Sequence, residues 1–184
     1  MEIINDIQQS PRRFEWLAQN IQKNGFRVGA EIGVDQAVTT RYLLALCSQL
    51  HLYAVDNWAR PTLMLVGTTK YFHQDPHYAE KIFDARTQAF KDRLTILRGL
   101  SWEMAARVPD NSLDFVFIDA DHSYECVKRD ILAWTPKLKQ GRLMCGHDYD
   151  FDGVNKAITE LVPTYKYAGM DHVWYATKEE VVLN

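Results

Sequence analysis

The chain alternates short apolar segments with amphipathic segments of helical spacing, and this alternation restricts its fold more than any other feature. Strands are predicted at residues 28–33, 52–55, 94–97, 113–118 and 142–145, and helices at 39–50, 76–91, 102–108, 124–134 and 153–162. Strand–helix–strand units of this kind are right-handed, so the pattern predicts an α/β fold with a parallel sheet covered on both faces. Two late strands, at 166–167 and 172–176, have no helix between them and are expected to pair antiparallel at one edge.

Two further regions complete the domain organisation. Ser10 and Pro11 predict the N-cap and first residue of a cover helix that ends at Gly25, within a 1–25 N-terminal segment. Residues 58–75 lack periodicity and predict a loop or short helix, and we interpret region 58–92 as a lid over the site. With 184 residues and 47% apolar content, the chain is expected to form one domain over 1–184.

The charge balance and the cysteine spacing indicate which binding partners and which cellular compartment to expect. The chain has 21 Lys+Arg against 24 Asp+Glu, so no broad basic surface for nucleic acid or anionic lipid is expected, and a small-molecule ligand is favoured. The acidic start of the chain and the lack of a long apolar stretch argue against a signal peptide and a membrane span. The three cysteines have none of the spacings of zinc or redox sites, which suits the cytoplasm.

The first predicted strand ends in a turn that carries Glu31, Gly33 and Asp35. Ligands of open α/β sheets bind outside the carboxyl ends of the strands. A turn that binds a diphosphate uses several glycines and avoids carboxylates, whereas a cationic ammonium or sulfonium group is attracted by them. Asp56 ends the second strand at a spacing typical of a ribose-binding acid. In the alternative interpretations, the first turn is an ordinary tight turn with a solvated aspartate, and Asp56 is only a helix or turn cap at the end of its strand.

A second group of polar residues follows the most apolar strand, 113–118, and the strand after it. Asp119 to Glu125 contains two further acidic residues and His122, and Gly146 to Asp150 contains His147 and Asp148. Adjacent strands lie about 4.8 Å apart, so Asp119, His147 and Asp148 could converge on one divalent cation. In the alternative interpretation, a residue of the first segment only caps the next helix.

These motifs, in this order and spacing, resemble the class I S-adenosylmethionine-dependent methyltransferases. More narrowly, they are similar to the metal-dependent O-methyltransferases of the catechol, caffeoyl-CoA and macrocin types. The motifs that carry the resemblance are Glu31-Ile-Gly33, Val55-Asp56, Phe117 to Tyr124 and Gly146 to Tyr149, and the similarity runs from about Gly29 to Ala176. The resemblance implies a three-layer Rossmann-like sandwich whose seven-stranded, mostly parallel sheet has the order 3-2-1-4-5-7-6, with strand 7 antiparallel.

The resemblance also implies roles for individual residues. Those expected at the cofactor are Glu31 and Gly33 near the methionine part, Thr39 at its carboxylate, Asp56 at the ribose, Gly99 and Ser101 at the adenine, together with Asp35 and Asp119. Asp119, His147 and Asp148 match the metal ligands, and His122 stands where the catechol-type enzymes carry a lysine base. An imidazole ligand favours Mn, Fe or Zn over Mg, and without a metal His147 would itself be the base. Asp35 and Ala37 replace glycines of the family's usual loop.

The function expected from the sequence is S-adenosylmethionine-dependent methylation of a small hydroxylated acceptor with divalent-metal assistance. One alternative is a cofactor-binding module with a relic site. Another is an NAD-dependent oxidoreductase, which the carboxylates of the first turn disfavour. A homodimer remains open, and Trp16, Trp102 and Trp134 are interpreted as packing residues on helical faces.

Overall fold

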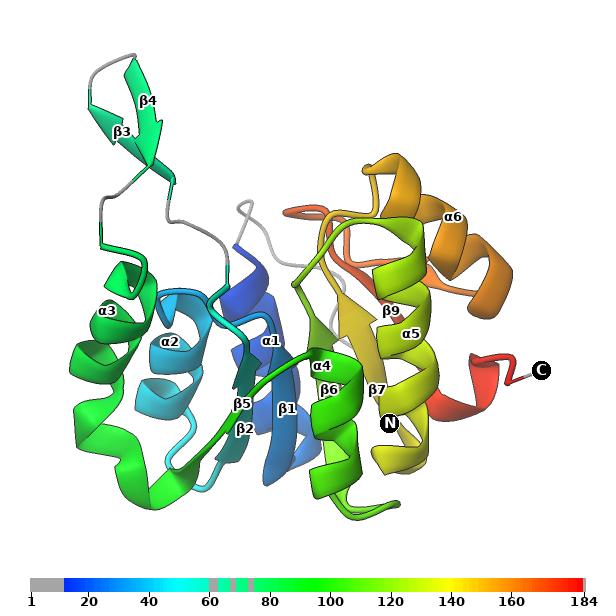
Figure 1. Ribbon diagram of the computed structural model, residues 1–184. Helices are drawn as coiled ribbons and strands as arrows, with labels where there is room; N and C mark the ends of the chain where they lie inside the picture. Colours follow the sequence, from blue (N-terminus) through cyan, green and yellow to red (C-terminus); the bar gives the residue numbers. More distant parts are fainter. Residues whose placement is uncertain (1–11, 60–62, 67–68, 73–74, 184) are drawn as a thin grey trace.

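The centre of the molecule is a seven-stranded sheet. The computed structural model describes residues 12–59, 63–66, 69–72 and 75–183 (Figure 1). The sheet has the order β5-β2-β1-β6-β7-β9-β8, and its strands are β1 Val28–Ile32, β2 His51–Asp56, β5 Leu94–Arg98, β6 Leu113–Ile118, β7 Leu138–Gly146, β8 Lys166–Tyr167 and β9 Trp174–Thr177. The strands pair in parallel except β9, which is antiparallel to both β7 and β8. When these seven strands are numbered from 1 to 7 in chain order, the sheet has the predicted order 3-2-1-4-5-7-6 with strand 7 antiparallel, so the fold prediction is confirmed.

Helices cover both faces of the sheet, which gives the three layers seen in Figure 1. One layer holds α1 Arg13–Asn24, α2 Val38–Leu46 and α3 Tyr78–Thr87, and the other holds α4 Ser101–Met104, α5 Tyr124–Trp134 and α6 Asp152–Leu161. Short 3-10 helices follow at η1 Gln88–Arg93, η2 Ala105–Arg107, η3 Thr135–Lys137 and η4 Lys178–Glu180. None of the helices in the described ranges combines the length and the apolar character needed to cross a bilayer.

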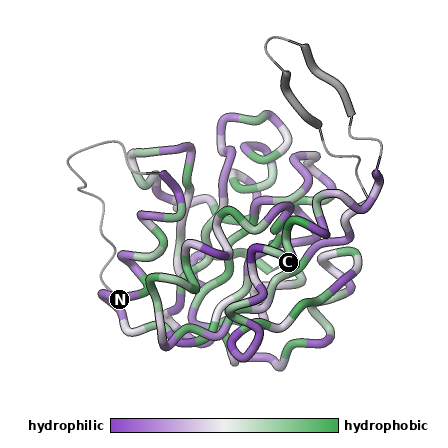
Figure 2. Tube along the Cα trace, turned by 90° about the vertical axis from the view of Figure 1, so that its left-hand side faces the viewer, coloured by the Kyte–Doolittle hydropathy of each residue, from purple (hydrophilic) through white to green (hydrophobic). Residues whose placement is uncertain are grey.

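Strand β6 explains why the sheet is buried on both sides. Successive side chains of a strand point to opposite faces. Phe115 and Phe117 pack with α1 and α2, whereas Val116 and Ile118 pack with α5 and α6. All six β6 residues are buried. Figure 2 shows the hydrophobic segments concentrated toward the middle of the trace. This double burial fixes where β6 ends, and therefore where Asp119 begins the next loop.

The start of the cover helix differs from the prediction. Ser10 and Pro11 lie outside the described residues, but the N-cap of α1 is Arg12, so the prediction that Pro11 is its first residue is wrong. The backbone N–H of Arg12 donates to the Glu15 carboxylate at 2.9 Å, and the Glu15 N–H donates to the Arg12 carbonyl at 2.9 Å, so Glu15 caps the start of the helix. The predicted end is confirmed, because Gly25 forms the left-handed C-cap with φ of 63°.

The segment predicted as a loop or short helix contains an antiparallel hairpin. Strands β3 Leu63–Val66 and β4 Thr69–Phe72 pair with each other and stand away from the main sheet, beyond α3, in Figure 1. The prediction missed them because four-residue strands are too short to show a clear alternation. The role of region 58–92 as a lid remains a prediction.

Candidate active site

A cleft of about 350 Å³ opens at the carboxyl ends of β1, β2, β5 and β6. The strand order reverses between β1 and β6, which is where open α/β sheets bind ligands. Six residues expected at the cofactor line it, namely Gly33, Asp35, Asp56, Gly99, Ser101 and Asp119. The other lining residues are Val55, Asn57, Trp58, Ala79, Leu100, Trp102, Ala120, Asp121, Cys126 and Asp130. Its volume falls within the range typical of small-molecule sites.

Gly33 is required where the first turn meets the end of β6. Its φ is +88°, and a Cβ at this position would lie 2.1 Å from the backbone oxygen of Asp119. The Asp119 N–H donates to the Ile32 carbonyl at 2.7 Å, which holds the two chain segments together. The sequence suggested that this glycine lets a ligand approach. The structure shows that it first lets the two segments approach each other.

Asp56 ties the first turn to the end of β2. Its Oδ2 accepts the backbone N–H groups of Val34 at 3.0 Å and Asp35 at 2.9 Å, and its Oδ1 accepts that of Trp58 at 2.8 Å. The interpretation of Asp56 as a turn cap is therefore confirmed. A carboxylate oxygen has more than one acceptor position, and Asp56 also lines the cleft. Its role at a ribose stays a prediction.

The first loop adopts glycine-like conformations without the glycines of the usual motif. Asp35 and Ala37 have φ values of 44° and 64°, in the left-handed region. The indole N–H of Trp58 donates to the Asp35 carbonyl at 2.9 Å, and the Trp58 ring packs edge-on against Phe83 at 5.2 Å. Burial and the Asp56 charge raise the pKa of Asp35. The left-handed conformation of this loop is therefore maintained by contacts with neighbouring residues rather than permitted by the conformational freedom of glycine.

Glu31 and Thr39 do not line the cleft, although the sequence placed both at the cofactor. Glu31 is only 2% exposed, and its Oε2 accepts the Thr40 hydroxyl at 2.6 Å on the α2 side of β1. Burial raises the pKa of Glu31 to about 8. The group therefore carries a proton near neutral pH, and the expected negative charge at this position is missing. Thr39 is buried within α2.

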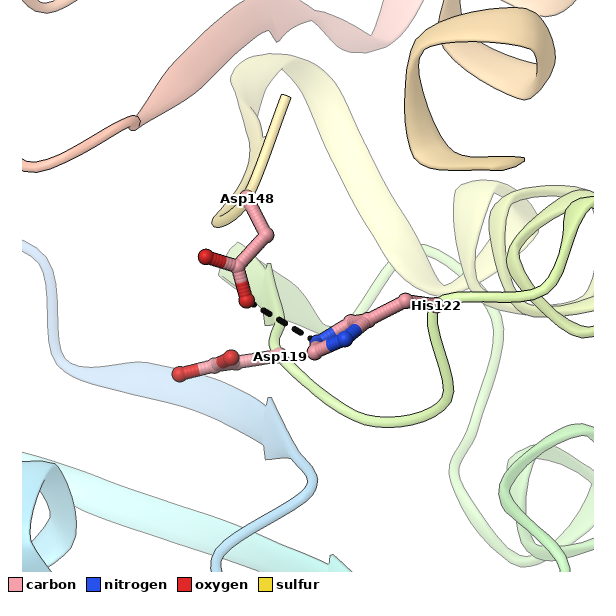
Figure 3. Close-up of side chains that lie close together, drawn as sticks. All are labelled: Asp119, His122 and Asp148. Atoms are coloured by element: carbon pink, nitrogen blue, oxygen red, sulfur yellow. Dashed lines mark ion pairs between the residues drawn. The ribbon is translucent and has the colours of Figure 1, made fainter. Parts of the chain in front are cut away.

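The second polar group gathers at the ends of β6 and β7, as expected from their pairing (Figure 3). Asp119, His122 and Asp148 each offer a ligand atom, and these atoms all lie within 4.8 Å of one another. His122 Nε2 lies 2.9 Å from Asp148 Oδ2. His147 contacts the other oxygen of Asp148, with its Nδ1 at 2.8 Å from Asp148 Oδ1 and 3.6 Å from Asp119 Oδ1. His122, expected as the base, is therefore as close to the carboxylates as His147, expected as a ligand.

The nearby carboxylates favour the protonated forms of both imidazoles. The hydrogen bond to Asp148 raises the pKa of His122. Burial disfavours a charged His147, but the bonds and charges of Asp119 and Asp148 outweigh burial and raise its pKa to about 10. Burial likewise works against an ionised Asp148, yet the hydrogen bonds from both imidazoles hold its pKa well below its usual range. Within this cluster, each carboxylate therefore lies against at least one imidazole that can balance its charge.

Arg13 is a site residue that the sequence did not reveal. Its Nε lies 3.0 Å from Asp119 Oδ2, and its backbone N–H donates to Asp171 Oδ2 at 2.7 Å. Asp171 Oδ1 in turn lies 3.7 Å from His147 Nε2. No local pattern predicts that the start of α1 reaches the end of β6. We define Asp119, His122, His147, Asp148 and Arg13 as the histidine–aspartate cluster.

Two more cleft residues were missed, for different reasons. Trp102 was interpreted as a packing residue, but it lines the cleft, whereas Trp16 and Trp134 are fully buried as predicted. Asp130 lines the cleft from α5. Its spacing from Val127 and Trp134 places it on the buried face of that helix, and this periodicity was a usable signal.

Comparison with known proteins identifies the family. A family model described as a methyltransferase domain matches residues 30–149, which include both the cleft and most of the histidine–aspartate cluster. The chain belongs to this methyltransferase-domain family. Among curated proteins, no sequence matches the chain.

Solved structures share the fold at low sequence identity. An O-methyltransferase from Bacillus cereus in complex with SAH is 16% identical, with a TM-score of 0.63 over 94% of this chain and 82% of that one. A candidate caffeoyl-CoA O-methyltransferase from Staphylococcus aureus is 16% identical, with a TM-score of 0.65 over 95% and 85%. The TDP-rhamnose 3'-O-methyltransferase CalS11 of calicheamicin biosynthesis is 17% identical, with a TM-score of 0.63 over 89% and 76%. These likenesses concern the fold.

Proposed function

We propose that the protein is an S-adenosylmethionine-dependent O-methyltransferase that acts on a small hydroxylated acceptor with the help of a divalent metal ion. The observation that carries the proposal is that the histidine–aspartate cluster adjoins the cleft, with Asp119 belonging to both. A methyl donor in the cleft would therefore lie beside groups that can bind and deprotonate a hydroxyl. The methyltransferase-domain family and the O-methyltransferases among the structural neighbours support the same reaction.

The cleft residues fit a nucleoside cofactor. Its lining combines aromatic and apolar side chains with a few polar groups, which is typical of small-molecule sites. Asp56, Asp35 and Asp119 provide acceptors, and basic residues that would bind a diphosphate are absent from its described lining. S-adenosylmethionine supplies a methyl group on a positively charged sulfur. The chain's contribution is to position that group and the acceptor for in-line displacement.

The donor set of the cluster fits a divalent cation. Two carboxylates and an imidazole within 4.8 Å of one another favour Mn, Fe or Zn over Mg. Such an ion lowers the pKa of a bound hydroxyl. Asp119 and Asp148 would hold it with one imidazole, and the other histidine would accept the acceptor's proton. Because a metal ligand must be deprotonated, ion binding would also displace any proton from the imidazole that binds the ion.

Thermal unfolding with S-adenosylhomocysteine or NAD, each with and without Mn²⁺ or Zn²⁺, tests the proposal. A ligand at a hundredfold its dissociation constant adds roughly 2.7 kcal/mol to the stability of the folded state. We expect S-adenosylhomocysteine to raise the Tm and NAD to leave it unchanged. Stabilisation by NAD alone would instead support the oxidoreductase. An Asp119→Asn variant should lose the metal-dependent increment, whereas the exposed Asp110→Asn control should keep it.

A turnover assay distinguishes a catalytically active protein from one that only binds the cofactor. Candidate hydroxylated acceptors are screened for production of S-adenosylhomocysteine. With an acceptor in hand, we expect Asp119→Ala and His122→Ala to lower kcat. Full turnover in both variants would exclude the proposed chemistry, and cofactor binding without turnover of any acceptor would favour the relic binding module.

A further inference from the structure

A carboxyl group on α5 reaches the wall of the cleft with one oxygen unused. Asp130 is 1% exposed and lines the cleft beside Ser101. Its Oδ1 accepts a hydrogen bond from the Ser101 hydroxyl. Its Oδ2 is buried and has no hydrogen-bond partner among the residues that the structure describes. An unpaired buried acceptor is unfavourable, so a ligand that donates a hydrogen bond here would gain affinity.

The surroundings of Asp130 suit a flat heterocycle. Leu100 and Trp102, from the segment after β5, and Cys126, one turn earlier on α5, line the same cleft. These side chains are apolar or aromatic, so they can pack against the face of a ring and carry no charge. Burial raises the pKa of Asp130 to about 7. Above that pH the group is ionised, and its free oxygen can then only accept a hydrogen bond.

We propose that Asp130 reads the nucleobase of the cofactor, its Oδ2 accepting a hydrogen bond from the exocyclic amino group of adenine. The inference rests on the proposed function, because the purine is that of S-adenosylmethionine. Opposite the ionised carboxylate, a 6-oxo purine would place a carbonyl oxygen against Oδ2, and two acceptors would then face each other. Asp130 therefore makes the cleft selective for a 6-amino purine over a 6-oxo purine, with Ser101 fixing the orientation of its carboxyl group.

Calorimetric titration with two ligands tests this role. S-adenosylhomocysteine and its 6-oxo analogue S-inosylhomocysteine are titrated into the full chain and into Asp130→Asn. At a pH of about 8.5, where Asp130 is ionised, we expect the wild-type protein to bind the adenine ligand roughly tenfold more tightly or better. In Asp130→Asn the ratio should fall close to one, because an amide can turn either its oxygen or its NH₂ group toward the ligand. Glu125→Gln, exposed on the same helix, is the matched control and should keep the wild-type ratio.

The outcomes separate this inference from the proposed function. Equal binding of both ligands by the wild-type protein, or an unchanged ratio in Asp130→Asn, overturns the reading of adenine by Asp130. No binding of S-adenosylhomocysteine at all overturns the proposed function as well. If Asp130→Asn does not fold, a crystal structure of the wild-type complex decides. An adenine amino nitrogen within hydrogen-bonding distance of Oδ2 supports the inference, and one bonded elsewhere overturns it.

Discussion

The cleft and the histidine–aspartate cluster share Asp119 but differ in what satisfies their carboxylates. In the cleft, Asp56 accepts three backbone N–H groups, which cannot leave without rebuilding the first turn. In the cluster, Asp148 is paired with two imidazoles and Asp119 with Arg13. Side-chain cations can be exchanged for another cation, whereas backbone donors cannot. The cleft is therefore preorganised, and the cluster is closed by partners that a metal ion could replace.

The largest effect is expected where the two regions meet. Gly33→Ala forces a Cβ to within 2.1 Å of the Asp119 backbone oxygen at a φ of +88°. Left-handed strain and steric overlap together should lower the free energy of unfolding by about 4 kcal/mol. Urea denaturation measures the loss, and binding of S-adenosylhomocysteine should disappear with it.

Gly141→Ala is the matched control for this variant. Gly141 also has a left-handed φ, +65°, but no atom of the residues that the structure describes lies within 4 Å of the position that its Cβ would occupy. It should therefore show only the strain, about 1 kcal/mol. Similar losses in both variants would mean that the contact between the first turn and β6 contributes little.

The pH dependence of stability should distinguish the buried carboxyl group of Glu31 from the carboxyl groups that line the cleft. The pKa of Glu31 is raised to about 8 from its ordinary 4.5 because the group is buried. The folded protein therefore keeps a proton that the unfolded chain releases, so stability falls as the pH rises from about 4.5 to 8. Glu31→Gln cannot ionise and should be more stable than the wild type at pH 8, on the order of 3 kcal/mol.

At pH 5 the same variant should be nearly as stable as the wild type, because Glu31 is then protonated in the folded protein. Denaturant titrations at the two pH values give the comparison. The exposed Glu103→Gln serves as control and should show no pH-dependent difference. A parallel pH dependence of Glu31→Gln and the wild type would show that Glu31 ionises normally.

The cluster should tolerate loss of a carboxylate less well than the nearby surface does. Asp148→Asn removes the charge that both His122 and His147 contact. Charge-assisted bonds of this kind contribute about 2 kcal/mol, and we expect a loss of that size in urea denaturation at pH 6. Asp150→Asn breaks only the exposed pair with His172, and should cost less than about 0.5 kcal/mol. Equal losses would show that the cluster is no more tightly coupled than the surface.

The sequence predicted those parts of the two regions that depend on local pattern. The strands followed from the apolar segments of the chain, whereas their order in the sheet followed only from the resemblance to the methyltransferases. The convergence of Asp119 and Asp148 followed from the pairing of β6 with β7. The sequence could not show that the Glu31 side chain contacts Thr40. That contact depends on which helix covers each face of the strand, and the local pattern does not give this. The approach of Arg13 joins chain segments that are more than 100 residues apart, and no local signal encodes such a contact.

The last prediction asks whether Arg13 is a replaceable cation or a fixed part of the site. Its guanidinium contacts the Asp119 carboxylate, which would also bind the proposed metal ion. We therefore expect Arg13 and the metal ion to compete for Asp119. Arg13→Gln should therefore raise the affinity for Mn²⁺ or Zn²⁺ roughly fivefold to tenfold, as expected for the loss of one charge-assisted contact. Calorimetric metal titration measures the change.

Arg12→Gln separates this competition from a general effect of charge. Arg12 is the neighbouring residue and is exposed, so its loss changes the net charge equally without freeing Asp119. If both variants bind metal alike, the gain arises from net charge and Arg13 does not compete. If only Arg13→Gln weakens metal binding, the guanidinium positions Asp119 for the ion, and the cluster would then be as preorganised as the cleft.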